Sequence, residues 1–172
     1  KQYEKRMRTL HAHAHQILAS QERLERLQWE VLRMDSSEWS EVRRYSTPHP
    51  AVHKIAAAAL LLLGEHEART RNWVRCQAML GTLGPQGLFK RVISCQPDNL
   101  HPEIVARAEE IFNDLSEIDV HNVSVGIYVF FGWATGLIKE YHARKTNEDT
   151  DCDNGDKEKK VKPASVARQI EI

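Results

Sequence analysis

The first 45 residues carry a seven-residue repeat of apolar positions and contain no glycine or proline. The repeating positions hold Tyr3, Leu10, Ile17, Leu24 and Val31. Met7 and Ala14 occupy the intervening d-type positions, whereas the later d-type positions hold the polar Gln21 and Gln28. A narrow apolar seam on a charged helix needs a partner helix, so the pattern predicts one long coiled-coil-type helix with a loosely specified register. The alternative is an ordinary amphipathic helix packed on a globule.

Short helices are predicted after Pro48-His49-Pro50, because proline removes a backbone donor and disfavours helical backbone in the preceding residue. The predicted helices span residues 51–63, 71–80 and 85–94, a stretch that opens at Pro102, and residues 123–143. Gly64 and Gly81 are the predicted ends of the first two, and Thr70 is the predicted N-cap of the second. Together these elements predict an all-α fold, in which a long coiled-coil-type helix leads into a small multi-helix globular head.

The last part of the chain lacks an apolar period. Residues 146–162 are polar and charged, which predicts a disordered stretch or a linker and no second heptad helix. We therefore divide the chain into a stalk-like helix over residues 1–47, a helical head over residues 48–145 and a charged tail over residues 146–172.

Composition supports a single helical domain with extensions. The chain has 172 residues, of which only eight are glycine and six are proline, and this argues against an all-β fold with many tight turns. The three cysteines, Cys76, Cys95 and Cys152, are widely spaced and form no C-x-x-C pair. They fit a reducing compartment and predict neither a disulfide framework nor a zinc site. No signal peptide pattern opens the chain, and because it lacks an initial Met we expect a longer parent protein.

The net charge is zero, but the charges are unevenly distributed. Residues 48–101 carry six Lys or Arg against three Asp or Glu, whereas residues 102–138 carry Arg107 alone against six acids. Residues 139–145 are basic again. The head is therefore expected to have a basic face and an acidic face, and a uniformly polycationic or polyanionic protein is excluded. No nucleic-acid-binding motif accompanies the basic part, so nucleic acid is not an expected partner.

An uncharged run of 16 residues, 123–138, contains the G-x-x-x-G pair Gly132 and Gly136. A membrane span needs about 20 apolar residues, and this run is shorter and includes Ser124 and Thr135. A buried core helix is therefore the favoured interpretation, with a single membrane span as the competitor.

No motif for catalysis, a metal or a cofactor is found. His11 and His15 share a helix face with no carboxylate or Cys nearby, so we interpret them as a solvated face and predict no metal. The acidic stretch around Asp149 has Asn154 where a calcium loop needs glycine and Lys160 where it needs Glu. There is no G-x-S-x-G and no phosphate-binding loop. We expect no enzyme active site and no cofactor within this chain.

The order of features resembles the stalk and microtubule-binding head of the dynein heavy chain. The resemblance covers about residues 38–145 and rests on order and spacing, since no single piece is diagnostic. The matching pieces run from Trp39 to Pro50, from Ala51 through Leu60 to Glu65, then Trp73, Met79-Leu80, Leu88-Phe89, Val92-Ile93, Gly132-Trp133 and Glu140-Tyr141. Departures include Pro48-His49 in place of Pro-Pro.

The resemblance implies a head that binds the acidic surface of tubulin and two antiparallel helices that join it to an ATP-driven motor. By position, it implies microtubule contacts at His53 and Lys54 on the first head helix, Lys90 and Arg91 on a later helix, and Lys139 on the last. Lys54, Lys90 and Arg91 have no acid at i,i+3 or i,i+4 on their own helices, so we expect their charges to be free for a partner.

The expected function is thus microtubule binding in the cytoplasm and cytoskeleton, including a cilium or flagellum axoneme. The expected partners are tubulin and a second coiled-coil helix, with neither nucleic acid nor membrane. The alternatives are a non-motor coiled-coil scaffold whose head binds another protein, and the single-span membrane protein.

Overall fold

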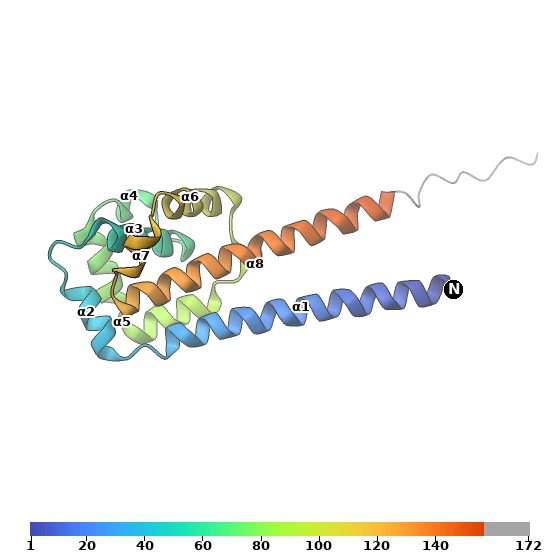
Figure 1. Ribbon diagram of the computed structural model, residues 1–172, viewed down its shortest axis with the longest axis horizontal. Coiled ribbons are helices and arrows are strands. Elements are labelled where there is room, and N and C mark those ends of the chain that lie inside the picture. Colours follow the sequence, from blue (N-terminus) through green and yellow to red (C-terminus); the bar gives the residue numbers. More distant parts are fainter. Residues whose placement is uncertain (157–172) are drawn as a thin grey trace, which may run out of the picture.

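Two long helices and a helical head make up the computed structural model, which describes residues 1–156 (Figure 1). Helix α1 (Gln2–Leu32) and helix α8 (Val125–Asp156) lie side by side and run antiparallel, and both extend away from the head. The remaining elements form the head: α2 (Ser36–Arg44), α3 (Pro50–Leu62), α4 (Glu67–Thr70), α5 (Trp73–Ser94), the 3-10 helix η1 (Pro97–Asn99), α6 (Pro102–Asn113) and α7 (Glu117–His121). The described residues contain no strand, so the predicted all-α class is confirmed.

The single helix predicted over residues 1–45 is wrong, because the chain breaks between α1 and α2. The Asp35 carboxylate accepts hydrogen bonds from the backbone N–H of Ser37 at 2.8 Å and of Glu38 at 2.9 Å. The Glu38 carboxylate in turn accepts the Asp35 N–H at 3.1 Å. This reciprocal capping box satisfies the free donors of a new helix, so the D-x-x-E spacing starts α2 where no glycine or proline is present.

Helix α3 forms within one residue of its predicted bounds and is buried in the head, as expected from its apolar run. The His49 Nδ1 accepts the Ala51 N–H at 3.2 Å at its start. Gly64 follows its end with a φ of 94°, a left-handed conformation that glycine adopts without a steric penalty. The predicted bounds and the predicted end at Gly64 are confirmed, whereas the sequence pattern does not predict the His49 cap.

Helix α5 runs without interruption across residues predicted as two helices. Its N-cap is Asn72, whose side chain accepts the Arg75 N–H at 3.3 Å, and the predicted cap Thr70 instead ends α4. Gly81, the predicted end, lies inside the helix. An interior glycine costs only about 1 kcal/mol. Burial of Leu80 and Leu88 on either side of it offsets that cost.

Helix α6 begins at Pro102 as predicted, and Pro97 starts the 3-10 helix η1 just before it. The pattern does not predict α7, which is short and begins with a capping box between Ser116 and Asp119. In α8 the uncharged run packs into the head, with Ile127, Trp133 and Leu137 each at most 1% exposed. Among the described residues, we find no helix with the length and apolarity that a membrane span requires.

Helix α8 also extends beyond its predicted end at residue 143, through residues 146–156, for which disorder or a linker is predicted. Extending an existing helix avoids the unfavourable nucleation step, so a polar sequence without proline can continue it. The rest of the predicted tail, residues 157–172, lies outside the described residues.

Candidate functional site

His53 and Lys54 lie in a groove of about 540 Å³ between α3, α4 and α6. The His53 Nε2 is 2.8 Å from the Thr70 carbonyl oxygen, and its ring meets the Trp73 ring edge-on with centroids 5.9 Å apart. The Lys54 ammonium makes an ion pair with the Asp114 carboxylate at the end of α6. His53 therefore joins α3 to the end of α4 and the start of α5. The charge of Lys54 is paired with a carboxylate that follows α6.

The other charges in this groove are also paired. The Arg107 guanidinium lies 2.9 Å from the Glu67 carboxylate and 2.6 Å from that of Glu110. Arg71 approaches Glu67 at 3.9 Å. Three cations thus face three carboxylates, so the groove is close to neutral. Arg107 is on the acidic segment, yet it joins α4 to α6.

Lys90 and Arg91 are adjacent in sequence but have different surroundings. Lys90 is exposed. The Arg91 side chain is 28% exposed, donates to the Leu63 carbonyl oxygen at 2.5 Å and pairs with Glu65 at 2.8 Å. It therefore satisfies a free carbonyl after the end of α3. The expectation that Lys54 and Arg91 carry free charges is wrong, because their acidic partners lie on other elements.

Lys139 is exposed on α8. Lys90 and Lys139 make no ion pair with any other residue in the described part of the chain. The five predicted residues thus lie on α3, α5 and α8, and only His53 and Lys54 share a groove. Lys90 and Lys139 are the members whose charges face solvent.

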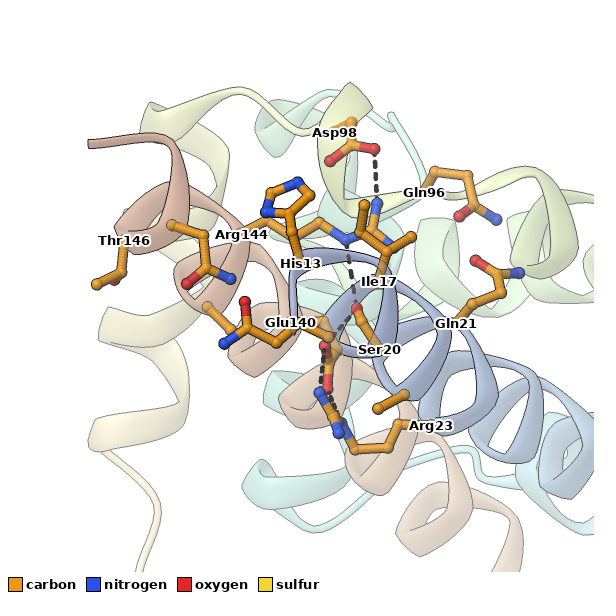
Figure 2. Close-up of a pocket in the computed structure, with 14 residues that line it drawn as sticks. His13, Ile17, Ser20, Gln21, Arg23, Gln96, Asp98, Glu140, Arg144 and Thr146 are labelled. Carbon is orange, nitrogen blue, oxygen red and sulfur yellow. Dashed lines mark hydrogen bonds and ion pairs between the residues drawn. The ribbon is translucent and has the colours of Figure 1, made fainter. Parts of the chain in front are cut away.

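A second polar site lies in the cavity between α1, η1 and α8 (Figure 2). Glu140 on α8 is only 6% exposed, and its carboxylate accepts the Ser20 hydroxyl at 2.6 Å. The Arg23 guanidinium donates to the same carboxylate through Nε at 2.5 Å and Nη2 at 3.3 Å. Ser20 and Arg23 stand three residues apart on α1, one turn of the helix, so both reach one carboxylate.

Arg144 extends this cluster to the head (Figure 2). Its Nη1 donates to the Asp98 carboxylate on η1 at 2.6 Å, and its Nε lies 3.4 Å from the Ser20 hydroxyl oxygen. The cluster of Ser20, Arg23, Asp98, Glu140 and Arg144, named here the junction cluster, therefore joins both long helices and the head.

The junction cluster keeps Glu140 ionised. Burial alone would raise the pKa of this carboxyl, but hydrogen bonds from Arg23 and Ser20 and the charges of Arg23 and Arg144 lower the pKa below its ordinary value. A carboxylate held in this state is a poor proton donor at neutral pH. The arrangement therefore suits a structural ion cluster better than acid–base chemistry.

Neither described thiol is arranged as a nucleophile. Burial raises the pKa of Cys76 and of Cys95 to about 11 in each case, so both remain protonated at neutral pH. No group of three or more His, Cys, Asp or Glu side chains could hold a metal ion within the described residues. The side chains around Asp149, where a calcium loop is rejected on sequence grounds, lie outside the described set.

Sequence reasoning missed the junction cluster, although a signal exists. Glu140 stands three residues after Leu137 and seven after Trp133, so it continues their face of the helix. An acid on an apolar face indicates a buried charge that needs partners. The partners on α1 could not be identified, because the pattern predicts no helix pair in this chain.

No protein-family model matches the chain, and no curated protein matches it.

Proposed function

We propose that the chain is a microtubule-binding module, in which α1 and α8 form a stalk and the helices between them form the binding head. The observation that supports this most is the returning helix: α8 leaves the head beside α1 and runs antiparallel to it (Figure 1). The resemblance to the dynein stalk implies such a return, whereas the apolar pattern alone does not predict it.

The proposed stalk is a coiled coil next to the head. Leu24 and Val31 of the seven-residue repeat are buried, together with Ser20 and Gln28. The Gln28 amide also donates to the Ile93 carbonyl oxygen at 3.3 Å, near the end of α5. Apolar repeats with occasional polar members are typical of helix pairs with a defined partner.

Lys90 and Lys139 are the main proposed contacts, because both are exposed and neither makes an ion pair within the described residues. Tubulin has a strongly acidic outer surface, and exposed cations attract such a surface at long range while binding it weakly and reversibly. Lys54 is a proposed contact whose charge is shared with Asp114. His53 and Arg91 would then support the binding surface from within the head.

We further propose that this chain acts by binding alone, without an active site or cofactor of its own, and that it works at the cytoskeleton in the cytoplasm or an axoneme. The ionised, fully bonded Glu140 and the protonated thiols of Cys76 and Cys95 support this. A motor activity would belong to the parent protein.

Charge reversal at the exposed lysines tests the proposal. Lys90→Glu and Lys139→Glu should each weaken co-sedimentation with microtubules by about 1 kcal/mol, roughly a fivefold rise in Kd. Lys5→Glu, an equal charge change on the exposed far half of α1, is the matched control and should leave Kd unchanged. If Lys5→Glu weakens binding as much as the other two, the binding face is elsewhere.

Lys54 is tested through its partner, because Lys54→Glu would also place two acids together on the head. Asp114→Asn removes the ion pair and leaves Lys54 in place. It should tighten binding at low salt, since the freed ammonium can then meet an acidic partner. Weaker binding by this variant would remove Lys54 from the proposed surface.

A non-motor scaffold is the second candidate, and one observation favours it. Tyr3, Leu10 and Ile17 are 75%, 62% and 54% exposed, so the far half of the apolar seam has no apolar cover among the described residues. A partner helix in trans would cover it. Self-association through residues 1–18, without co-sedimentation at low salt, would favour this candidate over the first.

A further inference from the structure

Glu140 is a buried charge placed between two long helices, and its bonds all cross from one element to another. Its carboxylate meets Ser20 at 2.6 Å and Arg23 at 2.5 Å on α1 (Figure 2). The Arg23 side chain is 55% exposed, whereas that of Glu140 is only 8% exposed. The carboxylate is therefore the buried partner, and it depends on α1 for its compensating charge.

The apolar seam of α1 does not by itself choose one alignment with α8. Apolar residues recur every seven positions from Tyr3 to Val31, so a shift of α1 along its axis by one repeat brings like residues to like places. A polar residue at a single seam position is the means by which helix pairs specify one register. Glu140 meets this description.

Shifts of α1 that follow its seam from Ser20, to Leu24, to Ile17 or by a full repeat, offer Glu140 no substitute for Arg23. One step along the seam would replace Ser20 and Arg23 by Leu24 and Leu27, or by Ile17 and Ser20. A full seven-residue shift would replace them by Leu27 and Glu30, or by His13 and Gln16. None of these pairs contains a guanidinium, and one contains a like charge. Each shift would leave a buried carboxylate without its cation.

We propose that Glu140 is a register-setting residue, which holds α1 and α8 in one antiparallel alignment through Ser20 and Arg23. Arg144 anchors the same point to the head through Asp98 on η1. This role concerns the helix pair and holds whatever the head binds, so it does not rest on the proposed microtubule contacts.

The distance between two spin labels, measured by pulsed electron paramagnetic resonance, tests the alignment in the full chain. The labels are placed through Arg8→Cys and Ala143→Cys, both at exposed positions, in a Cys152→Ser background. Cys76 is buried and Cys95 half-buried, and both thiols stay protonated at neutral pH. With Glu140 beside Ser20 and Arg23, the two labelled positions are offset by about ten residues, ~15 Å along the axis.

The chain with Glu140 intact should give one distance. Glu140→Gln keeps the size of the side chain but removes its charge, and Glu140→Leu makes the seam apolar. Both should add a second distance population, which corresponds to an axial shift of about 5 Å for one step of the seam or about 10 Å for one repeat. The matched control is Glu22→Gln, which removes an exposed carboxylate of α1 and should keep one distance.

A charge swap distinguishes an effect on the alignment of the two helices from an effect on stability alone. Arg23→Glu combined with Glu140→Arg restores an opposite pair at the same place and should restore a single distance. A single unchanged distance in both Glu140→Gln and Glu140→Leu would overturn the proposal, even if both variants melt at lower temperature. If Glu140→Leu does not fold, the other variants still test the proposal. A second distance in Glu140→Gln that the charge swap removes supports it, and a single unchanged distance in Glu140→Gln overturns it.

Discussion

Gly132 and Gly136 stand one turn apart on α8 but differ in their neighbours. A Cβ built on Gly136 would lie 2.2 Å from Cδ1 and 3.3 Å from Cγ of Leu27 on α1, whereas a Cβ on Gly132 would meet nothing within 4 Å. Of these two glycines, only Gly136 therefore lies at the close approach of α1 and α8. The G-x-x-x-G spacing reflects one packing requirement in this head, and no such requirement explains Gly132.

Alanine substitutions should separate the two glycines. Gly136→Ala should lower the free energy of unfolding by about 1 kcal/mol, because Cδ1 and Cγ of Leu27 must both move away and the side chain then leaves its packed rotamer. Gly132→Ala should raise the free energy of unfolding by about 1 kcal/mol through helix propensity. Urea unfolding followed by circular dichroism measures both, and equal effects would contradict the close contact.

The lowered pKa of Glu140 predicts an acid-sensitive contribution to stability. A carboxyl whose pKa is lower in the folded than in the unfolded chain stabilises the fold above its unfolded pKa, and this contribution disappears as pH falls through the folded pKa. At pH 7, Glu140→Gln should therefore be less stable than the parent by about 2 kcal/mol. At pH 3 the difference should shrink. A difference that is constant from pH 7 to pH 3 would show that the charge of Glu140 is not what stabilises the cluster.

At the scale of elements, the sequence pattern succeeds where apolar periodicity and proline agree. Helix α3 and the start of α6 follow directly from these signals. The errors have local causes: a capping box at Asp35 starts a helix within an uninterrupted pattern, and Gly81 is tolerated inside α5. A seven-residue apolar period contains no information about a helix cap, so it does not predict the break at Asp35. A glycine in the sequence suggests a helix end, but it does not show whether core packing compensates for its cost, as it does at Gly81.

Asp35→Ala tests whether the break between α1 and α2 is determined by the cap. Loss of the cap should lower the free energy of unfolding by about 1 kcal/mol, and Asp35→Asn, which keeps an acceptor, should retain most of it. A single helix over residues 1–45 would give the opposite result, since alanine is the better residue in a helix interior. Thermal melting of the three proteins measures this, and a more stable Asp35→Ala variant would favour the unbroken helix.

At the scale of the whole molecule, the charges along the sequence do not show which side chains pair in the folded chain. The spacing of charges along one helix indicates that Lys54 and Arg91 are free, but folding brings Asp114 and Glu65 to them from other elements. For the same reason the pattern does not predict the junction cluster, in which Ser20 and Glu140 are 120 residues apart in the sequence. Ion pairs between distant elements require the tertiary arrangement, which periodicity does not contain.

Microtubule binding by the neutral chain should depend strongly on ionic strength. Exposed charge pairs are screened beyond about 10 Å at 0.1 M salt, so co-sedimentation should be clear at low salt and weaker at moderate salt. Helical content should stay constant over the same range, because the apolar core and Glu140 are buried. Binding that does not change with salt would point to an apolar contact in place of the proposed lysines.

The N-terminal end of α1 and the C-terminal end of α8 lie on the same side of the molecule, far from the head (Figure 1). A tension applied between those two ends would therefore peel α1 from α8 one turn at a time, and would not slide one along the other. Residues 1–18 are all exposed, so peeling them uncovers no buried side chain. The first firm barrier is the turn that holds Ser20 and Arg23 against Glu140. A pulling experiment on single molecules should thus record a soft extension followed by one abrupt rupture, and Glu140→Gln should lower the rupture force.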